Sequence, residues 1–323
     1  MKYNKLFQLY FIFIFTTNVY TKENLFFYEE ALRTEKVSPL FSLQLYETFL
    51  RQNPPKKYST AVVFRLFDIY YNLNKTEELL ILSETYTLDK SRVLRLELLY
   101  QKISKIIGLP SEELKKIIKL IINKDTDSIE ALIEICKNKK NNILQNYIFA
   151  LKFKMNDLES ISYLIRQISD TSPIILIIFN IKENNPNLKE IIEEYVPISS
   201  NDEYKKEIFY LYGLYLSKNR RYKEAIRFYK MSNSYSTNVN SEYVTKSTME
   251  IAKNLYIKGN PDEACNQLSG KKLFIQNESD EFLKIFCDEG RSSELIKIPN
   301  TLKFLSKRDN GIVFKRFLYD KNI

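Results

Sequence analysis

The sequence contains no histidine and few of the residues that build tight turns or reactive clusters. Its 323 residues include 6 glycines, 9 prolines and 3 cysteines. Without histidine, the chain cannot form a Ser-His-Asp or Cys-His catalytic group, or a metal site with histidine ligands. Neither a G-x-x-x-x-G-K-[ST] loop nor a G-x-G-x-x-G loop occurs, so nothing predicts a phosphate cradle. We therefore expect a protein that is not an enzyme and has no cofactor or metal.

The scarcity of glycine and proline argues against an all-β sandwich, which needs frequent turns. The hydrophobic content of 44% argues against disorder and allows a large core, in one elongated domain or two. The charge is basic but diluted, because 49 basic and 40 acidic side chains are mixed along the chain. No DNA or RNA recognition motif accompanies this charge, so we expect no nucleic-acid partner.

The three cysteines, Cys136, Cys265 and Cys287, are too few for a disulfide framework, and no C-x-x-C occurs. Cys265 and Cys287 could pair in an oxidising compartment. The other interpretation, which we favour from the sequence, is that each packs as a small apolar residue.

The amino terminus has the order of a secretory signal peptide. Lys2 and Lys5 precede the apolar run Leu6–Phe15, and polar residues begin at Thr16. The run is too short to cross about 30 Å of hydrocarbon as a helix. We predict that residues 1–21 are a signal peptide or membrane-directing segment, and that the protein is exported to the periplasm or cell envelope. The alternative is an amphipathic first helix within the core.

Residues 203–270 predict two helical hairpins in tandem. Helices approach to about 8–9 Å only where one side is small. The first hairpin has small residues at such positions, and aromatic residues fill the gaps between them: Gly213, Ala225 and Ser232, with Tyr212, Tyr222 and Tyr229. In the second hairpin Ala252 and Ala264 repeat the spacing of Gly213 and Ala225. The stretches Lys218–Tyr222 and Gly259-Asn260-Pro261 form the turns.

This spacing resembles the tetratricopeptide repeat (TPR). The resemblance implies an all-α protein, an α-solenoid of antiparallel helix hairpins wound as a right-handed superhelix. It assigns structural contacts to Gly213, Ala225, Tyr229, Ser232, Ala252, Gly259 and Ala264. In such arrays the first helices line a concave groove, here with Tyr210, Leu214, Lys218, Met249, Lys253 and Tyr256. The sequence departs from the family at Phe209, where tryptophan is usual, and at Thr237, which replaces a closing proline. An ordinary helical bundle is the alternative.

The remaining sequence predicts helices, most of them about 12–16 residues long, between short polar breaks, as a solenoid requires. We expect them at Phe27–Leu32, Ser38–Gln52, Tyr58–Tyr71, Thr76–Thr87, Ser91–Ile107, Ser111–Asn123, Ser128–Lys137, Asn142–Lys154, Asp157–Ile168 and Leu188–Tyr195. The apolar run Pro173–Phe179 resembles a strand, but its helical neighbours favour a buried helix.

These elements predict five parts of the chain. The first 21 residues are followed by degenerate hairpins over residues 22–183, a joint over 184–202, two TPR-like repeats over 203–270 and a capping segment over 271–323. In the last segment Asp309-Asn310-Gly311 predicts either a β-hairpin turn or the end of a helix.

We therefore expect an exported TPR-like scaffold that holds a protein or peptide partner. Aromatic rings with lysines in its groove suit a peptide with acidic groups. One alternative is a peptidoglycan-active enzyme using glutamates such as Glu77-Glu78, Glu112-Glu113 or Glu193-Glu194. The other is a protein that binds an anionic membrane surface through its basic end, with Lys307, Arg308, Lys315 and Arg316.

Overall fold

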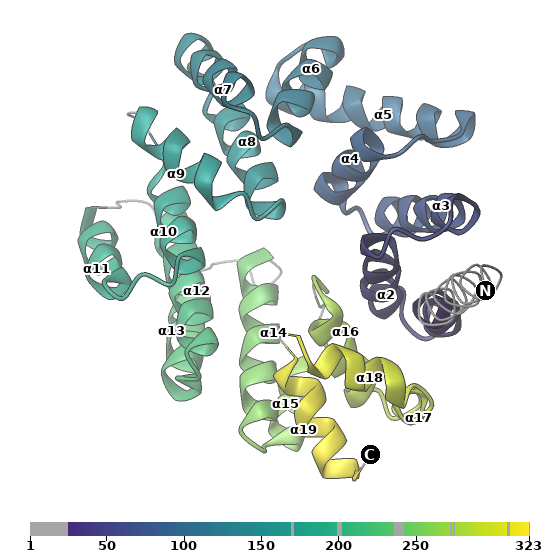
Figure 1. Cartoon of the computed structure of the whole chain (residues 1–323). Helices are drawn as coiled ribbons and strands as arrows, with labels where there is room; N and C mark the ends of the chain where they lie inside the picture. The colour runs from purple at the N-terminus through teal and green to yellow at the C-terminus, as the bar shows by residue number, and fades with distance from the viewer. Residues whose placement is uncertain are drawn as a thin grey trace, which may run out of the picture. The chain divides into compact units, whose positions relative to one another are not determined.

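The computed structural model describes residues 25–168, 171–198, 202–235, 242–271, 273, 275–308 and 311–322. All regular elements in these ranges are helices, which confirms the all-α prediction. The chain divides into two compact units, which Figure 1 shows with their helices labelled. We call Asn74–Phe274 the central unit, and Met1–Leu73 with Ile275–Ile323 the terminal unit. The predicted signal peptide lies outside the described residues.

The central unit is a succession of helices joined by short breaks. They are α4 (Thr76–Thr85), α5 (Lys90–Ile107), α6 (Ser111–Ile122), α7 (Thr126–Lys139), α8 (Asn142–Lys154), α9 (Leu158–Gln167), α10 (Pro173–Lys182), α11 (Leu188–Ile198), α12 (Asp202–Lys218), α13 (Tyr222–Ser234), α14 (Glu242–Ile257) and α15 (Pro261–Leu268). Most bounds lie within two residues of those predicted. The apolar run after Pro173 is helix α10, with Ile174, Ile175 and Ile177 buried.

Polar side chains fix where several of these helices begin. Asp89 accepts a hydrogen bond from the amide of Arg92, and Asn141 accepts from Ile143 and Leu144. Asp125 caps α7 in the same way, so this helix begins two residues before the predicted start at Ser128. Such caps satisfy amides that have no partner within the helix. Gly108, with φ of +78°, ends α5 in the left-handed conformation that glycine adopts without strain.

Helices of the central unit pack mainly against their neighbours in the sequence. Adjacent helices contact each other along most of the unit, and these contacts are most extensive from α12 through α15. The even-numbered helices α4, α6 and α8 also contact one another, as do α10, α12 and α14 in succession. One apolar cluster extends from α4 to α10. This packing in adjacent pairs is compatible with a helical repeat.

Residues 203–270 form the two predicted hairpins, α12 with α13 and α14 with α15. A methyl group placed on Gly213 would lie 2.5 Å from Cε1 of Tyr229, so this glycine allows the close approach of α12 and α13. Ala225, Ala252 and Ala264 are fully buried. The hydroxyl of Ser232 donates to the carbonyl of Lys206 at 2.8 Å and so joins α13 to α12. The sequence analysis named Gly213, Ala225, Ser232, Ala252 and Ala264 as small residues at helix contacts.

Both predicted turns are present, and each contains a residue with positive φ, which is a glycine in one turn and an arginine in the other. Gly259 has φ of +93°, and Pro261 occupies the first turn of α15. In the first hairpin Arg220 takes the left-handed position with φ of +61°, where glycine would be free of strain. The predicted joint at residues 184–202 lies within the central unit, and the units separate instead near Leu73 and Phe274.

The terminal unit combines the two ends of the described chain. It contains a helix over residues 25–34, followed by α2 (Pro39–Arg51), α3 (Lys56–Asn72), α16 (Glu278–Cys287), α17 (Ser293–Ile296), α18 (Pro299–Ser306) and α19 (Ile312–Lys321). Helix α16 contacts α2. The carboxyl-terminal segment is therefore helical on both sides of the predicted Asn-Gly turn, and the β-hairpin alternative is wrong for the described residues.

Aromatic contacts and hydrogen bonds join these distant segments. The ring of Phe282 lies 5.1 Å from that of Phe314 and 5.4 Å from that of Phe317, with all three side chains buried. The guanidinium of Arg291 donates to the carbonyl of Val37 at 2.9 Å. The carboxylate of Glu281 accepts from the Leu40 amide at 3.2 Å and from the Ser38 hydroxyl. None of these pairings is evident from the sequence.

Candidate functional site

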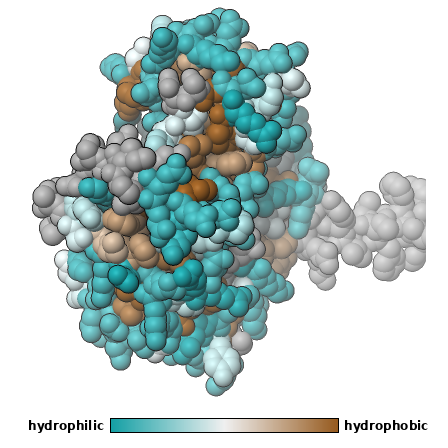
Figure 2. Space-filling view, turned by 90° about the vertical axis from the view of Figure 1, so that its left-hand side faces the viewer, coloured by the Kyte–Doolittle hydropathy of each residue, from teal (hydrophilic) through white to brown (hydrophobic). Residues whose placement is uncertain are grey.

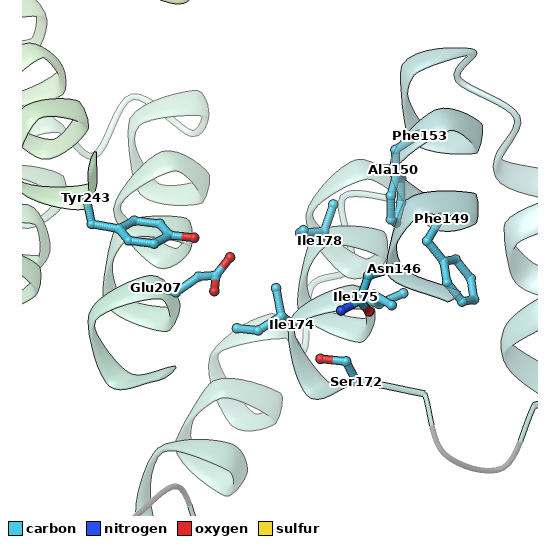
Figure 3. A pocket seen from close by; sticks show the side chains of 10 residues that line it. All are labelled: Asn146, Phe149, Ala150, Phe153, Ser172, Ile174, Ile175, Ile178, Glu207 and Tyr243. Carbon is cyan, nitrogen blue, oxygen red and sulfur yellow. The ribbon is translucent and has the colours of Figure 1, made fainter. Parts of the chain in front are cut away.

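A pocket in the central unit has a volume of about 360 Å³ and is lined by four even-numbered helices. Its lining comes from α8, from α10 and the serine before it, from α12 and from α14: Asn146, Phe149, Ala150, Phe153, Ser172, Ile174, Ile175, Ile178, Glu207 and Tyr243. We call it the even-helix pocket. Figure 3 shows side chains from these separate helices converging on one space.

One wall of the even-helix pocket is apolar. Phe149, Ile174 and Ile175 are buried, while Phe153 and Ile178 are half-buried. On α10, Ile174 and Ile178 are one turn apart and therefore lie on the same face. Such a wall can take an aliphatic or aromatic side chain from water, at a gain of about 25 cal/mol per Å² of apolar surface buried.

The opposite side is polar, with the hydroxyl of Tyr243 and the carboxylate of Glu207 directed toward the space. Tyr243 is held by its neighbours, since its ring lies 5.8 Å from that of Tyr210 and the ammonium of Lys246 lies 5.4 Å from its centre. The ring of Tyr210 lies 5.9 Å from that of Tyr229. Tyr229 fills the space left by Gly213, so the helix contacts predicted from the sequence also position the pocket rim.

The side chain of Tyr229 is fully buried, and this burial raises the pKa of its phenol well above the ordinary value. The nearby Glu250 carboxylate raises the pKa further. Tyr229 is therefore neutral at physiological pH and acts as a spacer rather than as an acid or base. The hydroxyl contributes no proton chemistry to the site.

Basic side chains lie toward the carboxyl ends of three helices that form the pocket. Burial lowers the pKa of Lys182, and the charges of Lys218 and Lys154 lower it further. They stand at or near the carboxyl ends of α10, α12 and α8. Arg220, Lys223 and Lys258 border a second, shallow hollow beside the α12–α13 turn. We call Lys182, Lys218, Arg220, Lys223 and Lys258 the basic edge.

Helical spacing places the pocket and the basic edge on one strip of surface. On α12, Lys218 follows Glu207 by eleven residues, which is three turns, and Leu214 lies between them at seven. On α10, Lys182 follows Ile178 by one turn, and on α8 Asn146, Ala150 and Phe153 share a face. This strip along α8, α10 and α12 is mainly apolar at one end and cationic at the other. Figure 2 shows one face of the molecule, which is mostly hydrophilic with hydrophobic residues between the hydrophilic ones.

The six predicted groove residues fall into different environments. Tyr210, Met249, Lys253 and Tyr256 are buried, Leu214 is half-buried and Lys218 is exposed. The Lys253 ammonium contacts the Glu250 carboxylate, its neighbour one turn earlier. Only Leu214 and Lys218 belong to the strip described above. A partner-binding role for the other four stays a prediction, and their burial gives them no open surface to offer.

Sequence reasoning missed most of the lining of the even-helix pocket. Asn146, Ala150 and Phe153 lie in a segment without a recognised repeat, and Ile174 to Ile178 belong to a run that indicated only burial. Glu207 and Tyr243 each precede the first predicted groove residue of their helix. If the predicted groove had been placed one to two turns closer to the start of α12 and α14, it would have included Glu207 and Tyr243.

Two of the three glutamate pairs lie at helix starts, and the third, Glu193-Glu194, lies within α11, where Glu193 is 3.6 Å from the Lys189 ammonium. Glu77 and Glu78 open α4, and the Glu78 carboxylate lies 2.8 Å from the Lys154 ammonium. Glu112 and Glu113 open α6, where they pair with Lys115 at 2.9 Å and Lys139 at 2.6 Å. Carboxylates in the first turn stabilise a helix through its dipole. In the described ranges no group of three or more acidic or cysteine side chains is arranged to hold a metal ion.

The sequence analysis also singled out the basic carboxyl end and the cysteines. At the basic carboxyl end, Lys307 and Lys315 are exposed, whereas Arg316 pairs with Asp320 at 2.9 Å. Cys136 has a free thiol, whose pKa burial raises to about 11. Across the described part of the chain, no helix combines the length and the apolarity needed to cross a bilayer.

Comparison with known proteins does not place the chain in a family. No family model matches the sequence, and no curated protein does so either. The resemblance to the tetratricopeptide repeat therefore depends on the residues of this chain alone.

Proposed function

We propose that this protein is an exported, non-catalytic scaffold whose TPR-like hairpins form an α-solenoid with a right-handed superhelix. It binds a protein or peptide partner along its even-numbered helices. The observation that carries the proposal is the even-helix pocket, to which four helices, each separated from the next by one other helix, contribute. Lining shared in this way is typical of repeat proteins that hold an extended partner across several repeats.

The partner is a segment with one bulky apolar side chain and acidic groups a short distance away. The apolar side chain enters the even-helix pocket, where Phe153 and Ile178 cover it. The acidic groups meet the basic edge, which attracts them and favours one direction of binding. Because Glu207 and Lys218 are eleven residues apart on α12, the span is about 16 Å, or about five residues of extended chain.

Selection from a peptide library tests this proposal directly. Immobilised protein should enrich peptides with an aromatic or aliphatic residue about five positions from an acidic pair. Ala150→Arg should abolish binding of the enriched peptides, because Ala150 lines the pocket and is exposed enough to accept a larger side chain. Lys182→Glu with Lys218→Glu should weaken binding of the same peptides and remove its dependence on salt.

The matched control is Ile143→Arg, on the same helix α8, at a residue that is 53% exposed and does not line the pocket. It should bind like the unaltered protein. Enriched peptides that bind Ala150→Arg and Ile143→Arg equally well would contradict the assigned site, and the absence of any enrichment would contradict the function.

Export is tested separately, on the native protein. Its amino terminus should lie at or near residue 22 if the predicted signal peptide is removed. Peptide mapping without reductant would show whether Cys265 and Cys287 pair, as an oxidising compartment allows. A native chain that starts at Met1 and has only free thiols would contradict export.

A further inference from the structure

Helix α5 exposes an unusual share of apolar side chains. Ten large hydrophobic residues are exposed in the described chain, and four of them, Val93, Leu94, Leu98 and Ile106, lie on this one helix. Leu94 and Leu98 are 67% and 61% exposed. The other six are scattered over helices of both units, and single exposed hydrophobic residues are normal on protein surfaces. The clustering on α5 therefore needs an explanation.

Helical geometry places the two leucines in the centre of the outward face. Leu94 and Leu98 are one turn apart, and Gln101 and Lys105 continue the same face at seven and eleven residues from Leu94. The inward face consists of Tyr100, Ile103 and Ile107, which are buried against the core of the central unit. Val93 and Ile106 flank the outward face near the two ends of the helix. The helix is 18 residues long, which corresponds to about 27 Å.

The charges around this face are mainly basic. Helix α5 contains five basic residues and a single acid, Glu97. The Glu97 carboxylate lies 2.7 Å from the Lys115 ammonium, which also pairs with Glu112, and the capping Asp89 pairs with Arg92. Lys90, Lys102 and Lys105 are exposed around Leu94 and Leu98. The face thus presents protruding leucines surrounded by ammonium groups.

We propose that α5 binds the surface of an anionic lipid bilayer, with its axis in the plane of the membrane. Leu94 and Leu98 enter the boundary between headgroups and acyl chains, while Lys90, Lys102 and Lys105 meet lipid phosphates. Charge complementarity favours a lipid surface over a protein partner, because exposed lysines lie around the apolar centre of the face. This site is separate from the even-helix pocket and from the basic carboxyl end.

The test is binding of the full chain to vesicles of phosphatidylglycerol and phosphatidylcholine, compared with vesicles of phosphatidylcholine alone. The unaltered protein should bind the anionic vesicles, and more weakly at high salt. Leu94→Glu with Leu98→Glu should reduce partitioning at least about ten-fold, because apolar insertion is lost and two carboxylates are added. Lys102→Gln with Lys105→Gln should also reduce it about ten-fold at low salt.

A fluorescent reporter locates the contact without depending on affinity. The chain contains no tryptophan, so Leu98→Trp introduces a single indole. Its emission should be that of an exposed indole in buffer and should move to shorter wavelength when anionic vesicles are added. Circular dichroism of each variant should match the unaltered protein, because the substituted side chains are exposed.

Two controls separate this site from other routes to the membrane. Ile143→Glu, an exposed residue on α8, and Lys307→Gln with Lys315→Gln, in the terminal unit, should bind like the unaltered protein. Failure of the unaltered protein to bind anionic vesicles would overturn the proposal, as would binding lost only in the Lys307 and Lys315 variant. If the indole of Leu98→Trp is already shielded in buffer, and Leu94→Glu with Leu98→Glu dissociates a dimer, the face belongs to a second copy instead.

Discussion

The two units solve the same packing problem with different parts of the sequence. In the central unit, helices meet neighbours only a few residues away, and small residues such as Gly213 and Ala225 set how closely they approach. In the terminal unit, Phe41 and Phe314 make a ring contact across most of the chain length, at 6.1 Å. Large aromatic side chains there fill the space between segments that the sequence separates.

The difference extends to polar contacts. Ser232 binds the carbonyl of Lys206 only 26 residues away, whereas Arg291 binds Val37 across 254 residues and Thr301 binds Glu30 across 271. Closing such long loops costs conformational entropy before any contact is gained. The comparison teaches that stability in the central unit is mainly local, while the terminal unit depends on bringing the chain ends together.

The largest expected effect is that of a charge placed in a central-unit helix contact. Ala225→Glu buries a carboxylate at a fully buried position on α13 and should lower the free energy of unfolding by about 4 kcal/mol or more. Chemical denaturation followed by circular dichroism measures the loss. Lys230→Glu, on an exposed position of the same helix, should change stability by less than about 0.5 kcal/mol. Equal stability of the Ala225 and Lys230 variants would remove the proposed contact.

The next effect probes the terminal unit by removing an aromatic side chain. Phe282→Ala deletes a ring that contacts those of Phe286, Phe314 and Phe317. It should lower the free energy of unfolding by about 3 to 4 kcal/mol. Hydrogen exchange should show protection lost in α2, α16 and α19, with α12 through α15 affected less. Uniform loss of protection along the chain would break the distinction between the two units.

These contrasts explain what the sequence could predict. Small residues at fixed spacing and helix-breaking turns are local signals, so the hairpins at residues 203–270 and most helix bounds follow from them. The contact of Phe282 with Phe314 leaves no such signal, because aromatic residues are abundant along the whole chain. Whether a resemblance to TPR extends to the superhelix also depends on non-local geometry.

The candidate site was only partly predictable for the same reason. Leu214 and Lys218 were found because they lie on the strip of α12 that the repeat pattern indicates. Phe149, Phe153 and Ile178 come from helices whose sequences carry no repeat pattern, and they meet Glu207 only through packing. Four predicted groove residues proved to be buried, because periodicity identifies a helix face but does not reveal what covers it.

A smaller effect tests how closely the central hairpin is packed. Gly213→Ala places a methyl group 2.5 Å from the ring of Tyr229. Because this ring must then shift, the substitution should lower the free energy of unfolding by about 2 kcal/mol. Combining it with Tyr229→Leu should cost less than the sum of the two single changes, because the shorter side chain makes room. Strict additivity in a double-mutant cycle measured by denaturation would show that the two residues do not share this contact.

The smallest expected effect is on how the stability of each unit changes with pH. In the terminal unit, burial raises the pKa of Glu281, although the hydrogen bonds from Ser38 and Leu40 oppose the rise. In the central unit, burial acts to raise the pKa of Asp157, but the hydrogen bond and the charge of Lys152 outweigh burial and lower this pKa. A raised carboxyl pKa means that the folded state favours the proton. Glu281 thus contributes stability below its ordinary pKa near 4.5, and this contribution is lost as pH rises through the folded value. Asp157 has the opposite sign and loses its contribution as pH falls below about 4.

Glu281→Gln removes the ionisation but keeps an oxygen that can accept from the Leu40 amide. At acidic pH it should change stability by about 1 kcal/mol or less, as expected for one altered hydrogen bond. Between pH 4.5 and neutrality it should abolish the decline in stability that we expect for the unaltered terminal unit. Urea midpoints for both proteins across this range measure the difference. A decline that persists in Glu281→Gln would mean that another group in the terminal unit binds the proton, and that Glu281 anchors α2 in its ionised form.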